Sequence, residues 1–256
     1  MNPEPNPEMP SANVRVGCCG FPLSLERYAK LFRVVEVQQT FYQPPGVHTL
    51  EKWRAQVPPE FEFTLKAWQI ITHEASSPTY RRLHEPLSEQ EKRDVGAFRP
   101  TAPVLRAWDR TQGAARILQS RAILLQCPAR FRPTDENKEN LRSFIRRVRS
   151  DIRSRPQPEQ ITLVWEPRGD WRLEEVRELC AELGLVHGVD PLQQAPVTAG
   201  LGYFRLHGRT GYRYRYGDAE LKELCARARG FNPCYVFFNN LSMLEDARRF
   251  QDLLGN

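Results

Sequence analysis

The sequence predicts a TIM-like (β/α)8 barrel, an α/β fold in which eight parallel strands alternate with helices. The length of 256 residues suits one such domain. Short apolar, β-branched runs alternate with helical patterns from one end of the chain to the other. There are eight of these runs, which favours a closed barrel over an open sheet. The predicted strands span residues 14–18, 34–37, 61–67, 122–126, 161–165, 185–189, 203–206 and 235–238.

The segments between the strands carry helical signals, with two exceptions. Apolar residues recur at i, i+3, i+4 and i+7 within 141–148, 176–183 and 221–228, after the start signals Thr134, Asp170 and Asp218. Residues 191–200 leave no room for a proper helix, so the sixth crossover is expected to be degenerate. Residues 74–100 form a long polar stretch after the third strand. This stretch is either a lid over the C-terminal ends of the strands or a solvated loop with a short helix.

Composition narrows the class of protein. The net charge of +6 and the pI near 9.1 favour anionic ligands, but modestly, because 37 basic residues face 31 acidic ones. No apolar run approaches the roughly 18 residues of a membrane span, and the first residues do not read as a secretory signal. We therefore expect a cytoplasmic protein with no membrane partner, whose six cysteines stay reduced. Residues 1–13 are expected to be a disordered tail and residues 14–256 a single barrel domain.

Polar side chains gather where the predicted strands end. In a parallel barrel, alternate residues point inward and catalytic groups come from the C-terminal ends of several strands. Ionisable groups crowded in a concave barrel mouth are typical of a functional site. A ring of paired charges that only stabilises the fold is the alternative. The predicted catalytic residues are Glu36, Lys66, His73, Glu166, Asp190, Arg205 and His207.

This set suits acid/base chemistry on an anionic substrate. Glu36 or Glu166 could accept a proton, and His207 could act as acid or base near neutral pH. Lys66 and Arg205 could hold a phosphate or carboxylate. These two cations would also repel a metal ion, and the sequence contains no HxH or HxxxH spacing. No metal or other cofactor is therefore predicted.

Aromatic, amide and arginine side chains near the strand ends are predicted to bind the substrate. Residues 212–216 interleave tyrosine with arginine just after the seventh strand. That pattern could grip phosphates and stack on bases, which leaves nucleic acid open as a partner, or it could be a loop with alternating packing. The predicted substrate-binding residues are Tyr42, Trp68, Arg168, Tyr212, Asn239 and Asn240.

Several of these segments together resemble the YecE-like family, domain of unknown function 72. The segments occur in family order at 16–21, 35–42, 63–67, 71–73, 165–168, 189–190, 203–209 and 237–240. The resemblance implies a TIM-like barrel similar to those of xylose isomerases and of a zinc endonuclease that cuts at abasic sites, but it supplies no activity. The chain lacks the full His/Glu/Asp ligand set of those metal enzymes. It also has Phe21 where the family more commonly has tryptophan.

Three functions are compatible with these observations. The leading hypothesis is an enzyme, of hydrolase, lyase or isomerase type, that performs metal-free acid/base chemistry on a small anionic, phosphorylated or sugar-like substrate. The second is a nucleic-acid-binding or processing protein, and the third is a non-catalytic ligand-binding barrel. The oligomeric state is left open.

Overall fold

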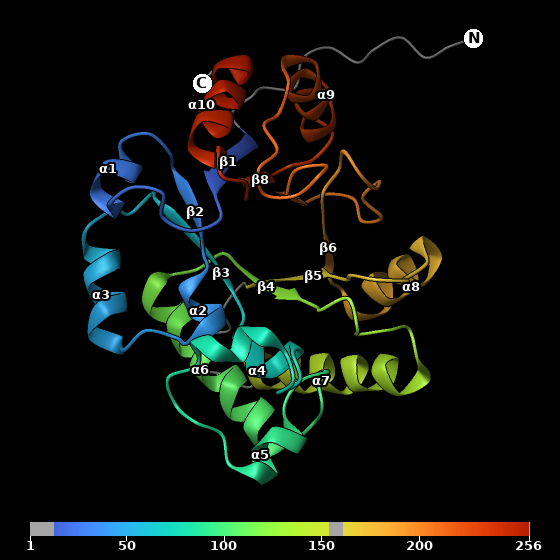
Figure 1. Ribbon diagram of the computed structural model, residues 1–256. Helices are drawn as coiled ribbons and strands as arrows, with labels where there is room; N and C mark the ends of the chain where they lie inside the picture. Colours follow the sequence, from blue (N-terminus) through green and yellow to red (C-terminus); the bar gives the residue numbers. More distant parts are fainter. Residues whose placement is uncertain (1–12, 154–160, 256) are drawn as a thin grey trace.

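The computed structural model describes residues 13–153 and 161–255, and it confirms the predicted barrel (Figure 1). Eight strands in this part of the chain are hydrogen-bonded in the order β1-β8-β7-β6-β5-β4-β3-β2, and every pair is parallel. The strands are β1 Val14–Cys18, β2 Val34–Val37, β3 Glu62–Lys66, β4 Ala122–Gln126, β5 Thr162–Glu166, β6 Val186–Val189, β7 Gly202–Leu206 and β8 Cys234–Phe238.

Helices surround the strands on the outside (Figure 1). Apolar residues from the outward faces of the strands pack against the helices in one large core that includes Val35, Phe63 and Trp165. The helices are α1 Leu25–Ala29, α2 Gln39–Tyr42, α3 Val47–Ala55, α4 Gln69–Thr72, α5 Glu89–Asp94, α6 Ala102–Leu118, α7 Asp135–Arg153, α8 Leu173–Leu183, α9 Asp218–Ala228 and α10 Met243–Leu254, with the 3-10 helix η2 Pro78–Arg82.

The barrel is nearly closed at a seam between β1 and β2. A single bridge pairs Cys19 with Glu36 there. Below it, the hydroxyl of Tyr28 accepts a hydrogen bond from the Cys18 amide at 2.7 Å and donates one to the Val34 carbonyl at 2.9 Å. Residue 17 must be glycine, because a Cβ atom would lie 2.3 Å from the Val34 carbonyl oxygen. The tyrosine hydroxyl therefore satisfies backbone groups that a continuous strand ladder would otherwise pair.

The barrel interior is apolar toward the N-terminal ends of the strands and charged toward their C-terminal ends. Inward-facing side chains such as Leu124, Val164 and Phe237 form a separate buried cluster. Successive strand residues point to opposite faces, so the inward positions two residues further along carry the polar groups. These positions lie at the C-terminal ends of the strands, which is where the sequence predicts the site.

The observed strand boundaries agree closely with those predicted from the sequence, but the predicted starts of two helices need correction. Each predicted strand end lies within one residue of the observed one, and no helix forms in 191–200. Asp170 and Asp218 are not the caps: α8 begins after Arg172, and Asp218 is already the first residue of α9, where it pairs with Arg249. Thr134 does accept from the Asn137 amide at 3.2 Å.

Two further segments bear on the predicted organisation. Residues 74–100 contain η2 and α5, and the Tyr80 hydroxyl ties this stretch to the His73 carbonyl at 2.7 Å. The predicted N-terminal tail falls almost entirely on residues 1–12, outside the described residues. Within the described ranges, each helix is too short or too polar to traverse a membrane.

Candidate functional site

Arg205, at the end of β7, lies between two buried glutamates. Its Nη2 donates to Glu36 Oε1 at 2.8 Å, and its Nη1 donates to Glu166 Oε2 at 2.6 Å. Glu36 is fully buried and also accepts from the Tyr203 hydroxyl at 2.7 Å and from the Gln38 amide. One guanidinium thus joins β2, β5 and β7 across the barrel interior.

The three charges of this group hold one another ionised. Burial alone would raise the pKa of both carboxyl groups, but the charge and hydrogen bonds of Arg205 outweigh it. The pKa of Glu36 is lowered, and that of Glu166 lies well below its usual value. Burial would likewise lower the pKa of Arg205, but the two carboxylates raise it. At neutral pH both glutamates are therefore charged and are weak proton acceptors.

Arg168, His207 and Asn239 extend this network toward solvent. Arg168 Nε donates to Glu166 Oε1 at 2.9 Å, and Arg168 Nη2 lies 3.0 Å from His207 Nε2. Arg205 Nη1 lies at the same distance from that nitrogen. Guanidinium groups only donate, so Nε2 is the acceptor and the neutral ring carries its proton on Nδ1. The side-chain amide nitrogen of Asn239, Nδ2, lies 3.0 Å from Nδ1. The two ends of an amide exchange places on a 180° turn, and the oxygen in that place would accept from the protonated Nδ1.

Lys66, at the end of β3, is the exception in this charged layer. The residue is 7% exposed, and its ammonium group makes no hydrogen bond or ion pair within the described part of the chain. Its ammonium lies 3.5 Å from the centre of the Phe41 ring. Burial lowers the pKa of Lys66 to about 7, with the charge of Arg205 contributing and that of Glu166 opposing.

His73 also packs against the Phe41 ring. The two rings meet edge to face, with centroids 4.9 Å apart, and His73 Nδ1 is 2.7 Å from the Thr72 hydroxyl. Burial and the nearby charge of Lys66 lower the pKa of His73 to about 3. The ring is therefore neutral at physiological pH.

A cavity of about 510 Å³ opens at the C-terminal ends of β5, β6 and β7. It reaches Glu166, Arg168 and His207, the outer part of the network, and Tyr212 is exposed at its edge. Asp190 also lines it and accepts from the Leu192 amide at 3.0 Å. Burial raises the pKa of Asp190, against the effect of its hydrogen bonds.

Three of the predicted substrate-binding residues lie apart from this cavity. Asn240 is turned toward α10, where its amide donates to Asp246 at 2.7 Å. Trp68 donates to the Tyr42 carbonyl at 3.2 Å and lines a different cavity beside α6. Tyr42 packs under the guanidinium of Arg82. These three residues do not line the cavity at the ends of β5, β6 and β7, and their role in substrate binding stays a prediction.

Sequence reasoning missed several residues that build the site. Tyr203 lies two residues before Arg205 in the same strand, so its side chain points to the same inward face. This spacing could have identified it from the sequence. Gln126 ends β4 in the same way, and it donates to Glu166 Oε1 at 2.7 Å. Phe41 belongs to α2, and its position over Lys66 could not be read from a strand pattern.

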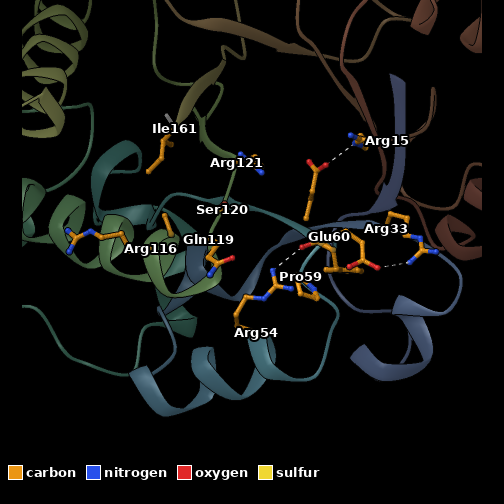
Figure 2. A pocket seen from close by; sticks show the side chains of 13 residues that line it. Arg15, Arg33, Arg54, Pro59, Glu60, Arg116, Gln119, Ser120, Arg121 and Ile161 are labelled. Carbon is orange, nitrogen blue, oxygen red and sulfur yellow. Dashed lines mark hydrogen bonds and ion pairs between the residues drawn. The ribbon is translucent and has the colours of Figure 1, made fainter. Parts of the chain in front are cut away.

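Another cavity, of about 870 Å³, lies at the opposite, N-terminal face of the barrel (Figure 2). Two of its arginines serve local structure: Arg15 pairs with Glu62 at 2.9 Å, and Arg54 donates to the Phe61 carbonyl at 2.9 Å. None of the predicted site residues lines it. In parallel barrels this face serves stability, whereas chemistry takes place at the other end.

The residues of the mouth do not fit a metal centre. Within 13–153 and 161–255, no group of three His, Cys, Asp or Glu side chains could hold a metal ion. The two buried carboxylates are bound by Arg205, so a cation would have to displace a guanidinium. The metal-ligand arrangement of the isomerase and endonuclease barrels is therefore not reproduced in the described residues.

Fold and site together define a parallel α/β-barrel protein with a buried, charged cluster at the C-terminal ends of its strands. The family model described as "Protein of unknown function DUF72" matches residues 20–256. The chain belongs to this family, as the sequence segments predict.

Solved structures with the same fold include two members of this family. A DUF72 family protein from Enterococcus faecalis has a TM-score of 0.69 and 22% identity over 95% of this chain and 98% of that one. One from Thermotoga maritima has a TM-score of 0.66 and 23% identity over 95% and 99%. A D-psicose 3-epimerase solved in the presence of D-fructose has a TM-score of 0.59 and 14% identity over 94% and 100%. At these identities the likeness shows the fold alone. A search of the curated proteins found no match.

Proposed function

We propose that this protein is an enzyme that performs metal-free acid/base chemistry on a small anionic, sugar-like substrate at the barrel mouth. The observation that carries the proposal is Lys66, a buried amine without a counter-ion in the described part of the chain. Burying an unpaired amine costs stability, and such costs are typical of functional sites.

The charges around Lys66 balance without it. Two carboxylates, Glu36 and Glu166, face two guanidinium groups, Arg205 and Arg168. A purely structural network would need no further cation. Lys66 adds a positive charge that an anionic substrate could neutralise, or an amine that could exchange a proton with a substrate.

Each group has a role in this proposal. Arg168, which lines the cavity with 37% of its side chain exposed, binds the phosphate or carboxylate of the substrate. Lys66 accepts and returns the proton, because its pKa of about 7 matches neutral pH. Glu36 and Glu166 hold Arg205 in place rather than take protons themselves. His207, neutral and anchored by Asn239, offers an orienting contact.

The names of similar structures support the choice of substrate class. Alongside the D-psicose 3-epimerase, a xylose isomerase domain containing protein from Salmonella typhimurium has a TM-score of 0.60 and 14% identity over 98% of this chain and 100% of that one. Both names refer to sugar chemistry at a carbon next to a carbonyl group. One route for such chemistry is removal of a proton from carbon by a base, which a neutral lysine can provide.

The test is proton exchange in D2O. The purified protein is incubated with a panel of three- to six-carbon sugar phosphates, and deuterium entry next to the carbonyl is followed by NMR. We expect exchange of at least one compound, and a loss of about a hundredfold or more in Lys66→Met, since positioned acid/base groups contribute roughly 10²–10⁴-fold.

A matched pair of arginines controls for general charge effects. Arg168→Met should weaken binding, measured by thermal shift with the same compounds, by about tenfold or more, because it removes the anion contact. Arg177→Met removes an equally charged but exposed side chain from α8 and should leave binding unchanged. Equal losses in both variants, or no exchange with any compound, would count against the proposal.

A further inference from the structure

We propose that Lys66 acts as a covalent catalyst: its amine forms an imine with the carbonyl carbon of an aldehyde or ketone substrate in the barrel mouth. The inference rests on the proposed function and deepens it, because it names the reacting group of the substrate and the bond that forms.

The geometry around Lys66 leaves its nitrogen available for this bond. A lysine that serves structure donates to carboxylates or carbonyls, as Lys138 does to Glu175 at 2.8 Å. Lys66 has no such partner among the described residues, and the ring face of Phe41 lies 3.5 Å away. A ring face compensates a buried ammonium only partly. No strong hydrogen bond has to break before the nitrogen reacts.

The surroundings also suit an imine. Lys66 itself is not among the residues that line the mouth cavity, but Glu166 and Arg168 line it, and their charges act on the Lys66 amine. Burial disfavours the charged amine, and the resulting pKa of about 7 supports the inference, since about half of the lysine is neutral at pH 7. The inference therefore requires that a short substrate, whose anionic end Arg168 holds, extends from the cavity to the amine.

The step balances without an oxidant or a reductant. The lone pair of the neutral amine attacks the carbonyl carbon, a C–N bond forms, and the carbonyl oxygen takes up a proton to give a carbinolamine. The C–O bond then breaks, and the oxygen leaves as water while the nitrogen loses a proton. The net change is amine plus carbonyl to imine plus water. The imine draws electrons from the adjacent C–H bond, which makes that proton easier to remove.

Reductive trapping tests the inference directly. The protein is incubated at pH 7 with dihydroxyacetone phosphate, and in parallel with dihydroxyacetone, in the presence of sodium cyanoborohydride. Adducts are then located by peptide mass mapping. The chain has only six lysines, Lys30, Lys52, Lys66, Lys92, Lys138 and Lys222, so the other five serve as internal controls. At a pKa of 10.5, only about one molecule in 3,000 of an exposed lysine is neutral at pH 7.

We expect the adduct on Lys66 to form at least tenfold faster than on any other lysine, and faster with the phosphorylated compound. Lys66→Arg, which keeps the charge but cannot form the imine, should lose this adduct while still binding the compound in a thermal-shift assay. Lys222→Met, at an exposed position on α9, should change nothing. Circular dichroism verifies that each variant is folded.

The outcomes separate this inference from the proposed function. If sugar phosphates bind and exchange protons but no adduct forms on Lys66, the imine is refuted and Lys66 acts only as a base. If the adducts spread over the exposed lysines at equal rates, the imine is also refuted. If neither binding nor exchange nor an adduct occurs, both proposals fail.

Discussion

Replacing Lys66 with methionine should make the protein more stable, by an amount that depends on pH. Methionine keeps most of the apolar volume over Phe41 and removes the buried amine. In the wild type, the pKa of this amine is lowered from 10.5 to about 7. At about 1.4 kcal/mol per pH unit, this corresponds to roughly 5 kcal/mol of lost stability.

The sign follows from proton binding. Between pH 7 and 10.5, the unfolded chain holds the lysine proton and the folded protein does not, so wild-type stability rises with pH across this window. Below pH 7 both states are protonated, and the folded protein bears the full cost. The gap between Lys66→Met and the wild type should therefore be largest at pH 7 and below, and should close as the pH approaches 10.5.

Urea unfolding of both proteins between pH 6 and 9 measures this gap. Any difference in packing between lysine and methionine adds a constant offset, so the slope of the gap against pH is the informative quantity. We expect the gap to shrink by about 1.4 kcal/mol per pH unit above pH 7. Lys222→Met is the matched control and should run parallel to the wild type. Parallel curves for Lys66→Met as well would show that Lys66 is not a desolvated amine.

Three further substitutions in the barrel should change the free energy of unfolding, and urea unfolding measures each change. Arg205→Met should destabilise the fold by about 3–5 kcal/mol at pH 7, because Glu36 keeps a buried charge without its partner; a loss below about 1 kcal/mol would contradict the network. Tyr28→Phe removes the hydroxyl that bridges the seam and should cost about 1–3 kcal/mol; an unchanged midpoint would mean that water replaces it fully. Gly17→Ala places a methyl group 2.3 Å from the Val34 carbonyl oxygen and should also cost about 1–3 kcal/mol, whereas wild-type stability would show that the seam separates freely.

Much of the site could be predicted because every second residue of a strand in a parallel barrel points into the barrel interior. Glu36, Lys66, Glu166 and Arg205 stand at inward positions of four strands, and parity alone places them on the inside. The C-terminal end of each strand is visible in the sequence as the point where an apolar run turns polar. The convergence of these four residues needed no knowledge of the loops.

The pairing of these charges could not be predicted, because it depends on the shear of the barrel and on side-chain reach. Nothing in the sequence indicates that Arg205, rather than Lys66, forms ion pairs with both Glu36 and Glu166. The direction of side chains just beyond a strand could not be predicted either, because the chain turns there and the period of two no longer holds. Trp68 and Asn240 follow strand ends, yet they face the helices.

The pKa of Lys66 itself can be measured by NMR, from the chemical shift of its side-chain carbon and nitrogen nuclei as the pH is varied. With only six lysines in the chain, comparison with Lys66→Met assigns the signal. We predict a midpoint near pH 7 for Lys66. A midpoint near 10.5 would mean that the amine is solvated or paired, and both the base and the imine assigned to it would have to be abandoned.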